Sequence, residues 1–193
     1  MRITGGRACR IRLLVPKHAD VRPSMDTSRE RVFNRIGSDL PGTIVFDCFA
    51  GNGAYGLEAL SHGASLCYFF EKSHKLIECL QKNCLSVCKS MRSDPSTCTK
   101  IIRTDLFATD FATFLPPNFI FFDPPYRFWD ENNHALHRVL TALATLFPIA
   151  VLVLEFPSQS AWTTQSPWQP IRPLETSPKI NEARTELFRV VDR

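Results

Sequence analysis

The 193-residue sequence lacks any hydrophobic run long enough to span a bilayer, any internal repeat and any extended low-complexity segment. It also lacks a Cys-x-x-Cys pair, and its seven cysteines are scattered and odd in number. Cys84 and Cys88 could share one helix face, but no second ligand pair accompanies them. We therefore expect no membrane segment, no metal site and no disulfide framework, but reduced thiols in a cytoplasmic protein.

Charge is modest overall, at +4, and unevenly distributed. Residues 1–37 contain nine Lys and Arg against three Asp and Glu, whereas the remainder contains fourteen against sixteen. A basic leading segment on a near-neutral body is typical of a surface that attracts an anionic partner. Charge alone favours the simpler interpretation, a solvated basic terminus.

The leading segment is expected to form a small unit of its own, residues 1–37. Two β-prone runs, Arg2–Thr4 and Arg10–Val15, flank Gly5 and Gly6 and predict a hairpin. Thr27 and Glu30 match a capping box, so a helix is expected to begin there and to end at Gly37.

Residues 38–193 alternate between short apolar runs and helical patterns, and they are expected to form the main domain. The expected strands are Thr43–Cys48, Leu66–Phe70, Ile101–Arg103, Asn118–Phe122, Ala150–Phe156, and two more near Gln169–Leu174 and Glu186–Val191. Helices are expected from the glycine-rich turn to His62, from a cap at Ser73 onward, and over Glu131–Leu146, with a surface loop at 89–99. This order predicts right-handed crossovers and a doubly wound, mostly parallel α/β sheet.

A glycine-rich turn, Gly51-Asn52-Gly53-Ala54-Tyr55-Gly56, follows the first main strand and opens a helix. Such a turn lets a ligand approach the backbone and points amides toward it. Glu71 ends the next strand, where a carboxylate can accept hydrogen bonds from ribose hydroxyls. Nicotinamide dinucleotides and S-adenosylmethionine both fit, but Asp47 would repel a pyrophosphate and attract a methionyl amino group. Asp105, after the third strand, can accept from an adenine amine.

A second motif, Asp123-Pro124-Pro125-Tyr126, closes the most apolar strand. The prolines stiffen the turn, so the Asp123 carboxylate and the Pro124 carbonyl can form two convergent acceptors. Two acceptors on an exocyclic amine would direct its lone pair at an electrophilic methyl group and could take its proton. Tyr126 can stack on an extruded base.

With both motifs identified, the chain resembles the bacterial 16S ribosomal RNA guanine-N2 methyltransferases. The resemblance extends over most of the sequence and rests on Met1–Ile3, Arg22–Asn34, Asp47–Ala64 and Asp123–Tyr126. It implies a class I, Rossmann-like methyltransferase fold with a seven-stranded sheet and a final antiparallel strand. It also implies S-adenosylmethionine as the methyl donor and small-subunit ribosomal RNA, in an assembled or assembling subunit, as the partner of a monomer.

The resemblance also assigns site residues by position. The expected cofactor contacts are Asp47, Phe49, Ala50, Gly51, Gly53, Glu71, Lys72, Asp105, Leu106 and Asp123. The expected catalytic residues are Asp123, Pro124, Pro125 and Tyr126. The expected RNA contacts are Arg7, Arg10, Arg12, Arg22 and Arg29.

Two positions depart from the family pattern, and three rival functions remain open. The family's second hairpin glycine is replaced within Arg7-Ala8-Cys9-Arg10, and a glycine near the end is replaced before Arg184-Thr185. The rivals are a DNA or RNA adenine-N6 methyltransferase, a non-catalytic RNA-binding or ribosome-assembly factor, and a nicotinamide oxidoreductase. The short chain disfavours the adenine-N6 methyltransferase, and the intact motifs disfavour the non-catalytic factor. Asp47 disfavours the nicotinamide oxidoreductase.

Overall fold

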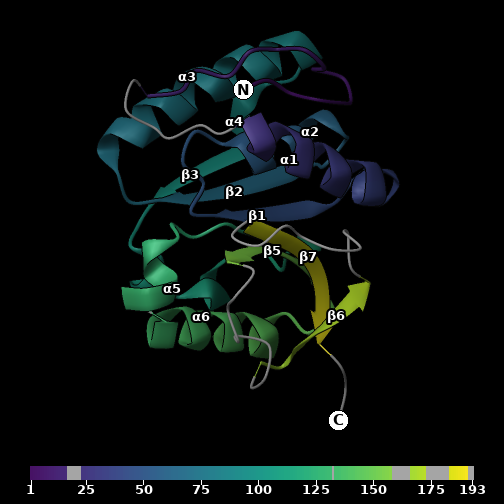
Figure 1. The fold of residues 1–193 in the computed structure, drawn as a ribbon. Helices are drawn as coiled ribbons and strands as arrows, with labels where there is room; N and C mark the ends of the chain where they lie inside the picture. The colour runs from purple at the N-terminus through teal and green to yellow at the C-terminus, as the bar shows by residue number, and fades with distance from the viewer. Residues whose placement is uncertain (17–22, 132, 158–165, 173–182, 191–193) are drawn as a thin grey trace.

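The computed structural model describes residues 1–16, 23–131, 133–157, 166–172 and 183–190. One mixed sheet forms its centre, with strands in the order β3-β2-β1-β4-β5-β7-β6 (Figure 1). The strands are β1 Ile44–Cys48, β2 Leu66–Glu71, β3 Thr99–Arg103, β4 Phe119–Phe122, β5 Val151–Pro157, β6 Trp168–Arg172 and β7 Ala183–Val190. Neighbours from β3 to β5 pair in parallel, whereas β7 runs antiparallel to both β5 and β6. This is the class I methyltransferase arrangement that the sequence predicted.

Helices cover both faces of the sheet (Figure 1). They are α1 Pro23–Ile36, α2 Ala54–Ser61, α3 His74–Met91, α4 Pro95–Cys98, α5 Arg127–Glu131 and α6 Asn133–Leu146. Three short 3₁₀ turns complete them: η1 Gly37–Asp39, η2 Leu106–Ala108 and η3 Phe111–Thr113. The first four helices lie on one face, and α5 and α6 lie on the other.

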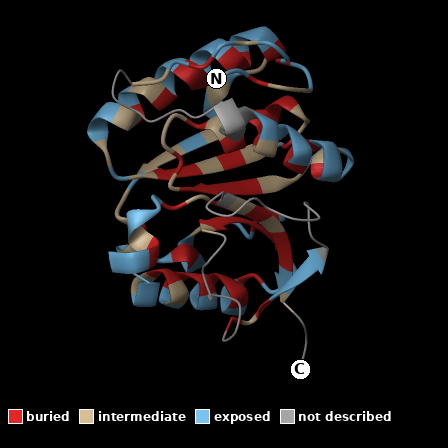
Figure 2. Ribbon diagram, viewed as in Figure 1, coloured by how far each residue is buried: buried red, intermediate tan, exposed pale blue. Residues whose placement is uncertain are grey.

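Two buried clusters, one on each face, hold the layers together (Figure 2). Alternate residues of each strand enter opposite clusters, as the pleat requires: Phe121 of β4 packs toward α1 and α2, and Phe122 toward α6. Ile3, Ala8 and Leu13 belong to the same cluster as Phe121. Residues 1–16 therefore share the core of the main domain.

Three local predictions are corrected by the structure. The helix α1 begins at Pro23, so Thr27 lies inside it and the capping box is wrong; proline is favoured at a first helical turn. Residues 89–99 are not a plain loop, because α3 continues to Met91 and Asp94 caps α4 by accepting from the Ser96 amide.

The third correction concerns the hairpin, which is reduced to a single bridge between Arg2 and Arg12. The helix expected over Glu131–Leu146 is confirmed by α6, Asn133–Leu146. The described residues contain no helix that combines the length and apolar character needed to cross a membrane.

Candidate active site

The glycine turn after β1 has the backbone that only glycine adopts without strain. Gly53 has φ +84° and precedes α2, and its amide donates to the Ala50 carbonyl over 2.7 Å. A Cβ at Gly53 would lie 2.4 Å from a methyl carbon of Leu80 on α3. The turn therefore lies close against α3 and leaves the first amides of α2 facing the carboxyl edge of the sheet.

Asp47, the fourth residue of β1, lies beneath this turn. It is 3% exposed, and its Oδ2 accepts from the Gly56 amide over 2.8 Å. A Cβ on Gly56 would lie 2.9 Å from the same oxygen, so this close approach requires glycine. Burial raises the pKa of Asp47 to about 8, against the Gly56 hydrogen bond and with a contribution from Glu71.

Glu71, at the end of β2, is oriented by two backbone amides. Its Oε2 accepts from Gly51 over 2.8 Å and its Oε1 accepts from Ser73 over 2.7 Å. Ser73 precedes α3 as expected, but its side chain makes no cap hydrogen bond. Each carboxylate oxygen has a second lone pair available to a ligand hydroxyl.

Asp105 follows β3 and faces Lys72. Its Oδ2 lies 2.7 Å from Lys72 Nζ, and its Oδ1 accepts from the Phe107 amide, which opens η2 at Leu106. The Lys72 hydrogen bond lowers the pKa of Asp105. The structure thus places Lys72 and Asp105 together beyond neighbouring strands.

Three half-buried phenylalanines form an aromatic group at the same sheet edge. Phe49 lies 6.0 Å from Phe107 and 5.8 Å from Phe128 between ring centroids, and Phe107 lies 5.6 Å from Phe128. Phe49 was expected from the motif, whereas Phe107 and Phe128 were missed. The sequence signal was position, since each lies two residues beyond a motif residue, Asp105 or Tyr126.

The Asp-Pro-Pro-Tyr turn extends β4 and leads into α5. Asp123 is half-buried, Pro124 is buried, and Tyr126 is 38% exposed. Burial raises the pKa of Asp123 well above its ordinary value, assisted by the negative charges of Glu155 and Asp47. Pro125 and Tyr126 offer their carbonyls to the amides that begin α5.

Glu155 on β5 was missed by the sequence analysis, although an acidic residue in an otherwise apolar strand was a visible signal. It is 8% exposed and receives the hydroxyls of two tyrosines. Tyr126 donates to Oε1 over 3.1 Å and Tyr55 donates to Oε2 over 3.3 Å.

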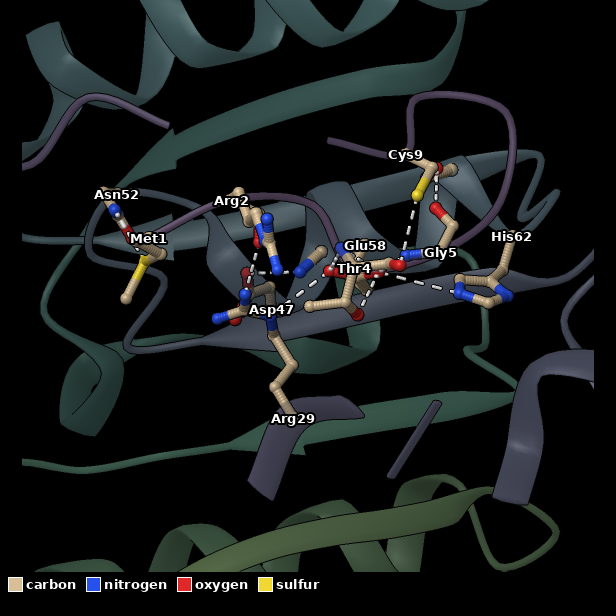
Figure 3. Close-up of polar contacts among 12 residues, drawn as sticks. Met1, Arg2, Thr4, Gly5, Cys9, Arg29, Asp47, Asn52, Glu58 and His62 are labelled. Carbon is tan, nitrogen blue, oxygen red and sulfur yellow. Dashed lines mark hydrogen bonds and ion pairs between the residues drawn. The ribbon is translucent and has the colours of Figure 1, made fainter. Parts of the chain in front are cut away.

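Arg29 corrects the expected set of RNA contacts. It is 1% exposed, its Nε lies 3.2 Å from Glu58 Oε2, and its Nη2 donates to the Arg2 carbonyl (Figure 3). The same Glu58 carboxylate accepts from the amides of Thr4 and Gly5. Arg29 therefore joins α1, α2 and the N-terminal segment, and its guanidinium is not available at the surface.

The other N-terminal arginines lie at the surface. Arg7, Arg10 and Arg12 are exposed, and Arg7 also donates to the Met91 carbonyl at the end of α3. Arg10 has φ +72°, a left-handed conformation that glycine adopts without strain. Arg22 lies outside the described residues.

The N-terminal segment contacts the glycine turn directly. Asn83 on α3 accepts from the Leu14 amide over 2.7 Å and donates to the Asn52 carbonyl over 2.9 Å. Asn52 in turn donates to the Leu14 carbonyl over 3.1 Å. The basic segment and the turn are therefore parts of one hydrogen-bonded unit.

The geometry agrees with the comparison to known families. A family model described as "Conserved hypothetical protein 95" matches residues 1–180. The chain belongs to this family. Its curated relatives include Ribosomal RNA small subunit methyltransferase D of Escherichia coli K12, 32% identical over 127 residues, 66% of this chain and 61% of the relative. The protein of the same name from Buchnera aphidicola is 31% identical over 109 residues, 56% of this chain and 53% of the relative. The matched part of the chain thus spans less than two thirds of these relatives.

Solved structures support the same fold. An Escherichia coli protein provisionally named methyltransferase yhhF superposes with TM-score 0.76 at 25% identity, covering 100% of this chain and 99% of that one. The magnesium protoporphyrin IX methyltransferase of Synechocystis, solved with bound SAM, gives TM-score 0.68 at 20% identity over 97% of this chain and 88% of its own.

Within the described part of this chain, no group of three or more His, Cys, Asp or Glu is arranged to hold a metal ion.

Proposed function

We propose that this protein transfers the methyl group of S-adenosylmethionine to the exocyclic N2 amine of a guanine in small-subunit (16S) ribosomal RNA. The observation that carries the proposal is the Asp123–Tyr126 turn at the end of β4, the strand beside β1 with its glycine turn. The names of the Escherichia coli and Buchnera aphidicola relatives support ribosomal RNA of the small subunit as the substrate.

Three carboxyl groups at this edge of the sheet have the chemistry needed to bind S-adenosylmethionine. Glu71, fixed by two amides, would receive the ribose hydroxyls; Asp105 would receive the adenine amine; and Asp47 would balance the positive methionyl end. The remaining contacts proposed along the turn and strand ends are Phe49, Ala50, Gly51, Gly53, Lys72, Leu106 and Asp123. When bound, the cofactor supplies an electrophilic methyl carbon, whose bond to sulfur breaks with its electron pair as the bond to nitrogen forms, leaving S-adenosylhomocysteine.

The Asp-Pro-Pro-Tyr turn supplies what an amine nucleophile needs. A base amine is a weak nucleophile because its lone pair is delocalised into the ring. Hydrogen bonds to the Asp123 carboxyl and the Pro124 carbonyl would orient its N–H groups, while Tyr126 stacks on the base. After transfer the nitrogen loses a proton, to Asp123 or through water to solvent. Asp123 is a stronger proton acceptor when ionised because its pKa is raised.

The exposed arginines of the N-terminal segment are proposed to receive RNA phosphates. Arg10 and Arg12 are exposed on a segment that is hydrogen-bonded to the glycine turn through Leu14. An RNA held there would lie close to the cofactor. The proposal includes a monomeric, cytoplasmic protein that acts on RNA in an assembled or assembling small subunit.

The test offers isotope-labelled S-adenosylmethionine with naked 16S RNA, small subunits and duplex DNA in parallel. Digestion to nucleosides then identifies the methylated base. Label in N2-methylguanosine is the expected result. Label only in N6-methyladenosine would assign the adenine chemistry instead, and no transfer to any substrate would favour the non-catalytic assembly factor.

A matched pair of variants tests the role of the turn. Asp123→Ala should lower the rate of transfer at least about 100-fold, because the amine loses one of its two acceptors. Asp110→Ala is the control, since Asp110 is an exposed aspartate that caps η3 by accepting from the Ala112 amide. Full activity of Asp123→Ala would refute the assigned chemistry.

A further inference from the structure

A buried carboxylate on β5 lies beside the catalytic turn. In the parallel register of β4 and β5, Phe122 pairs with Leu154. The residues that come next are Asp123, directly after β4, and Glu155, within β5. Phe121 and Val153, two residues earlier, pack into the cluster that faces α1 and α2. Strand alternation therefore directs Asp123 and Glu155 to that same face.

Glu155 is held rigidly on its buried side. Tyr55 on α2 donates its hydroxyl to Oε2, and the Tyr55 ring stacks on Phe121 with centroids 5.2 Å apart and planes at 25°. Tyr55 also packs against Phe33 of α1. One oxygen of the carboxylate is thus tied to the packed layer of helices.

The other oxygen holds the exposed member of the motif. Tyr126 donates its hydroxyl to Oε1 over 3.1 Å, while 38% of the residue remains exposed to solvent. An aromatic ring at a surface turn normally exchanges among rotamers within nanoseconds. A hydrogen bond at the hydroxyl end restricts that exchange.

We propose that Glu155 is a positioning residue for methyl transfer, which fixes the plane of the Tyr126 ring for stacking on the target base and sets the electrostatic environment of Asp123. The inference rests on the proposed function, because it assigns the stacking role to Tyr126. Glu155 touches neither substrate nor cofactor in this scheme and acts through its two neighbours.

The electrostatic part has a definite sign. Burial, Glu155 and Asp47 raise the pKa of Asp123, in that order. Among the described residues, this cluster also includes Tyr55 on α2, which interacts electrostatically with Glu155, Asp123 and Arg29 of α1. Removing the Glu155 charge should lower the pKa of Asp123. The rise of kcat with pH should then begin at lower pH than in the wild type.

The kinetic test is a double-mutant cycle of Glu155→Gln and Tyr126→Phe. Each single variant should lower kcat about tenfold and change the KM values for RNA and cofactor less than about threefold. The double variant should be no slower than about twentyfold, because both changes act on the same hydrogen bond: glutamine weakens its charged acceptor, and phenylalanine removes its donor. Tyr68→Phe is the control, since it removes a tyrosine hydroxyl on the α6 face of β2, and it should keep wild-type kcat.

Two kinetic outcomes would overturn the inference. Independent effects, with the double variant about a hundredfold slower, would mean that Glu155 does not act through Tyr126. Wild-type kcat in Tyr126→Phe would mean that the hydrogen bond between Tyr126 and Glu155 does not contribute to methyl transfer. This second variant leaves the buried carboxylate in place, so it tests the inference even if Glu155→Gln does not fold.

A readout without catalysis separates this inference from the proposed function. The chain has three tyrosines, so ring signals of ¹³C-labelled tyrosine can be assigned with three Tyr→Phe variants. The Tyr126 signals should move toward random-coil values in Glu155→Gln. If the signals move but no substrate is methylated, the proposed function is wrong, although Glu155 does position Tyr126. If the signals do not move, Glu155 does not position Tyr126, whatever the protein methylates.

Discussion

Replacing Glu58 by glutamine should remove about 4 kcal/mol from the free energy of unfolding. Glu58 is completely buried on α2, and its oxygens accept from Thr4, Gly5 and Arg29 at 2.7 to 3.2 Å (Figure 3). Glutamine keeps one acceptor oxygen but turns an NH₂ group toward donors that cannot receive it.

The magnitude follows from the partners left behind. Each hydrogen bond to a charged group contributes about 1.5–3 kcal/mol, and the contributions to one carboxylate do not add fully. Breaking a buried ion pair from one side costs about 3–5 kcal/mol, because Arg29 stays buried with a charge that has lost this counter-ion. A value near 4 kcal/mol is a large part of the roughly 5–15 kcal/mol typical of a whole domain.

Urea unfolding at neutral pH, followed by fluorescence and circular dichroism, measures this loss. With a slope of about 2 kcal/mol per molar, the midpoint should fall by about 2 M. Glu78→Gln is the matched control, because Glu78 pairs with His74 one turn away on α3 and both side chains are exposed. It should change stability by less than about 0.5 kcal/mol. A loss below about 1 kcal/mol in Glu58→Gln would refute the argument.

The acid side of the same prediction has a clear sign. Burial opposes ionisation of Glu58, but the His62 imidazole 3.6 Å away, hydrogen bonds from Thr4 and the charge of Arg29 outweigh it and lower its pKa below 4.5. The ionised form is thus favoured by folding, so its contribution is complete above pH 4.5 and disappears as pH falls through the lowered value. The glutamine variant should lack this part of the acid destabilisation.

Three further perturbations have defined outcomes. Arg10→Gly should stabilise the protein by about 1 kcal/mol, because glycine adopts the positive φ at this position without strain. It should also reduce the slope of log affinity for RNA against log salt by about 0.7–0.9, because one phosphate contact is lost. The control Arg138→Gln, on α6, should leave that slope unchanged. Gly56→Ala should destabilise by about 2–3 kcal/mol in urea unfolding, because its Cβ would meet atoms of Asp47, Cys67 and Phe69 within 3 Å. Asp47 has a raised pKa, so wild-type stability should decline as pH rises from 3.8 to about 8, whereas Asp47→Asn should show a flatter profile; equal slopes would contradict the assignment.

The sheet was predictable because its pattern is local. Runs such as Phe119–Phe122 are apolar without interruption, as strands buried on both faces must be, and Gly63, with φ +106°, follows the end of α2. The motif residues lie at or just past the carboxyl ends of β1 to β4, so parallel topology brings them to one edge: Asp47, Glu71, Asp105 and Asp123.

What the sequence could not predict depends on contacts between distant residues. Arg29 reads as one more basic residue, and only the packing of α1 on α2 assigns it to Glu58, 29 residues away. Glu155 is separated from Tyr55 by 100 residues, and no periodicity links them. The predicted start of α1 was wrong because the helix begins at Pro23, four residues before the capping pattern at Thr27.

The N-terminal segment makes its contacts far along the chain, and this has a consequence for folding during synthesis. Thr4 meets Glu58 across 54 residues, and Arg7 meets the Met91 carbonyl across 84. Since synthesis runs from the N-terminus toward the C-terminus, residues 1–13 emerge before α2 and α3 and must wait for them before they can dock. Closing such long loops costs entropy that only the finished core offsets. Residues 1–13 are therefore expected to be among the last to become protected from hydrogen exchange.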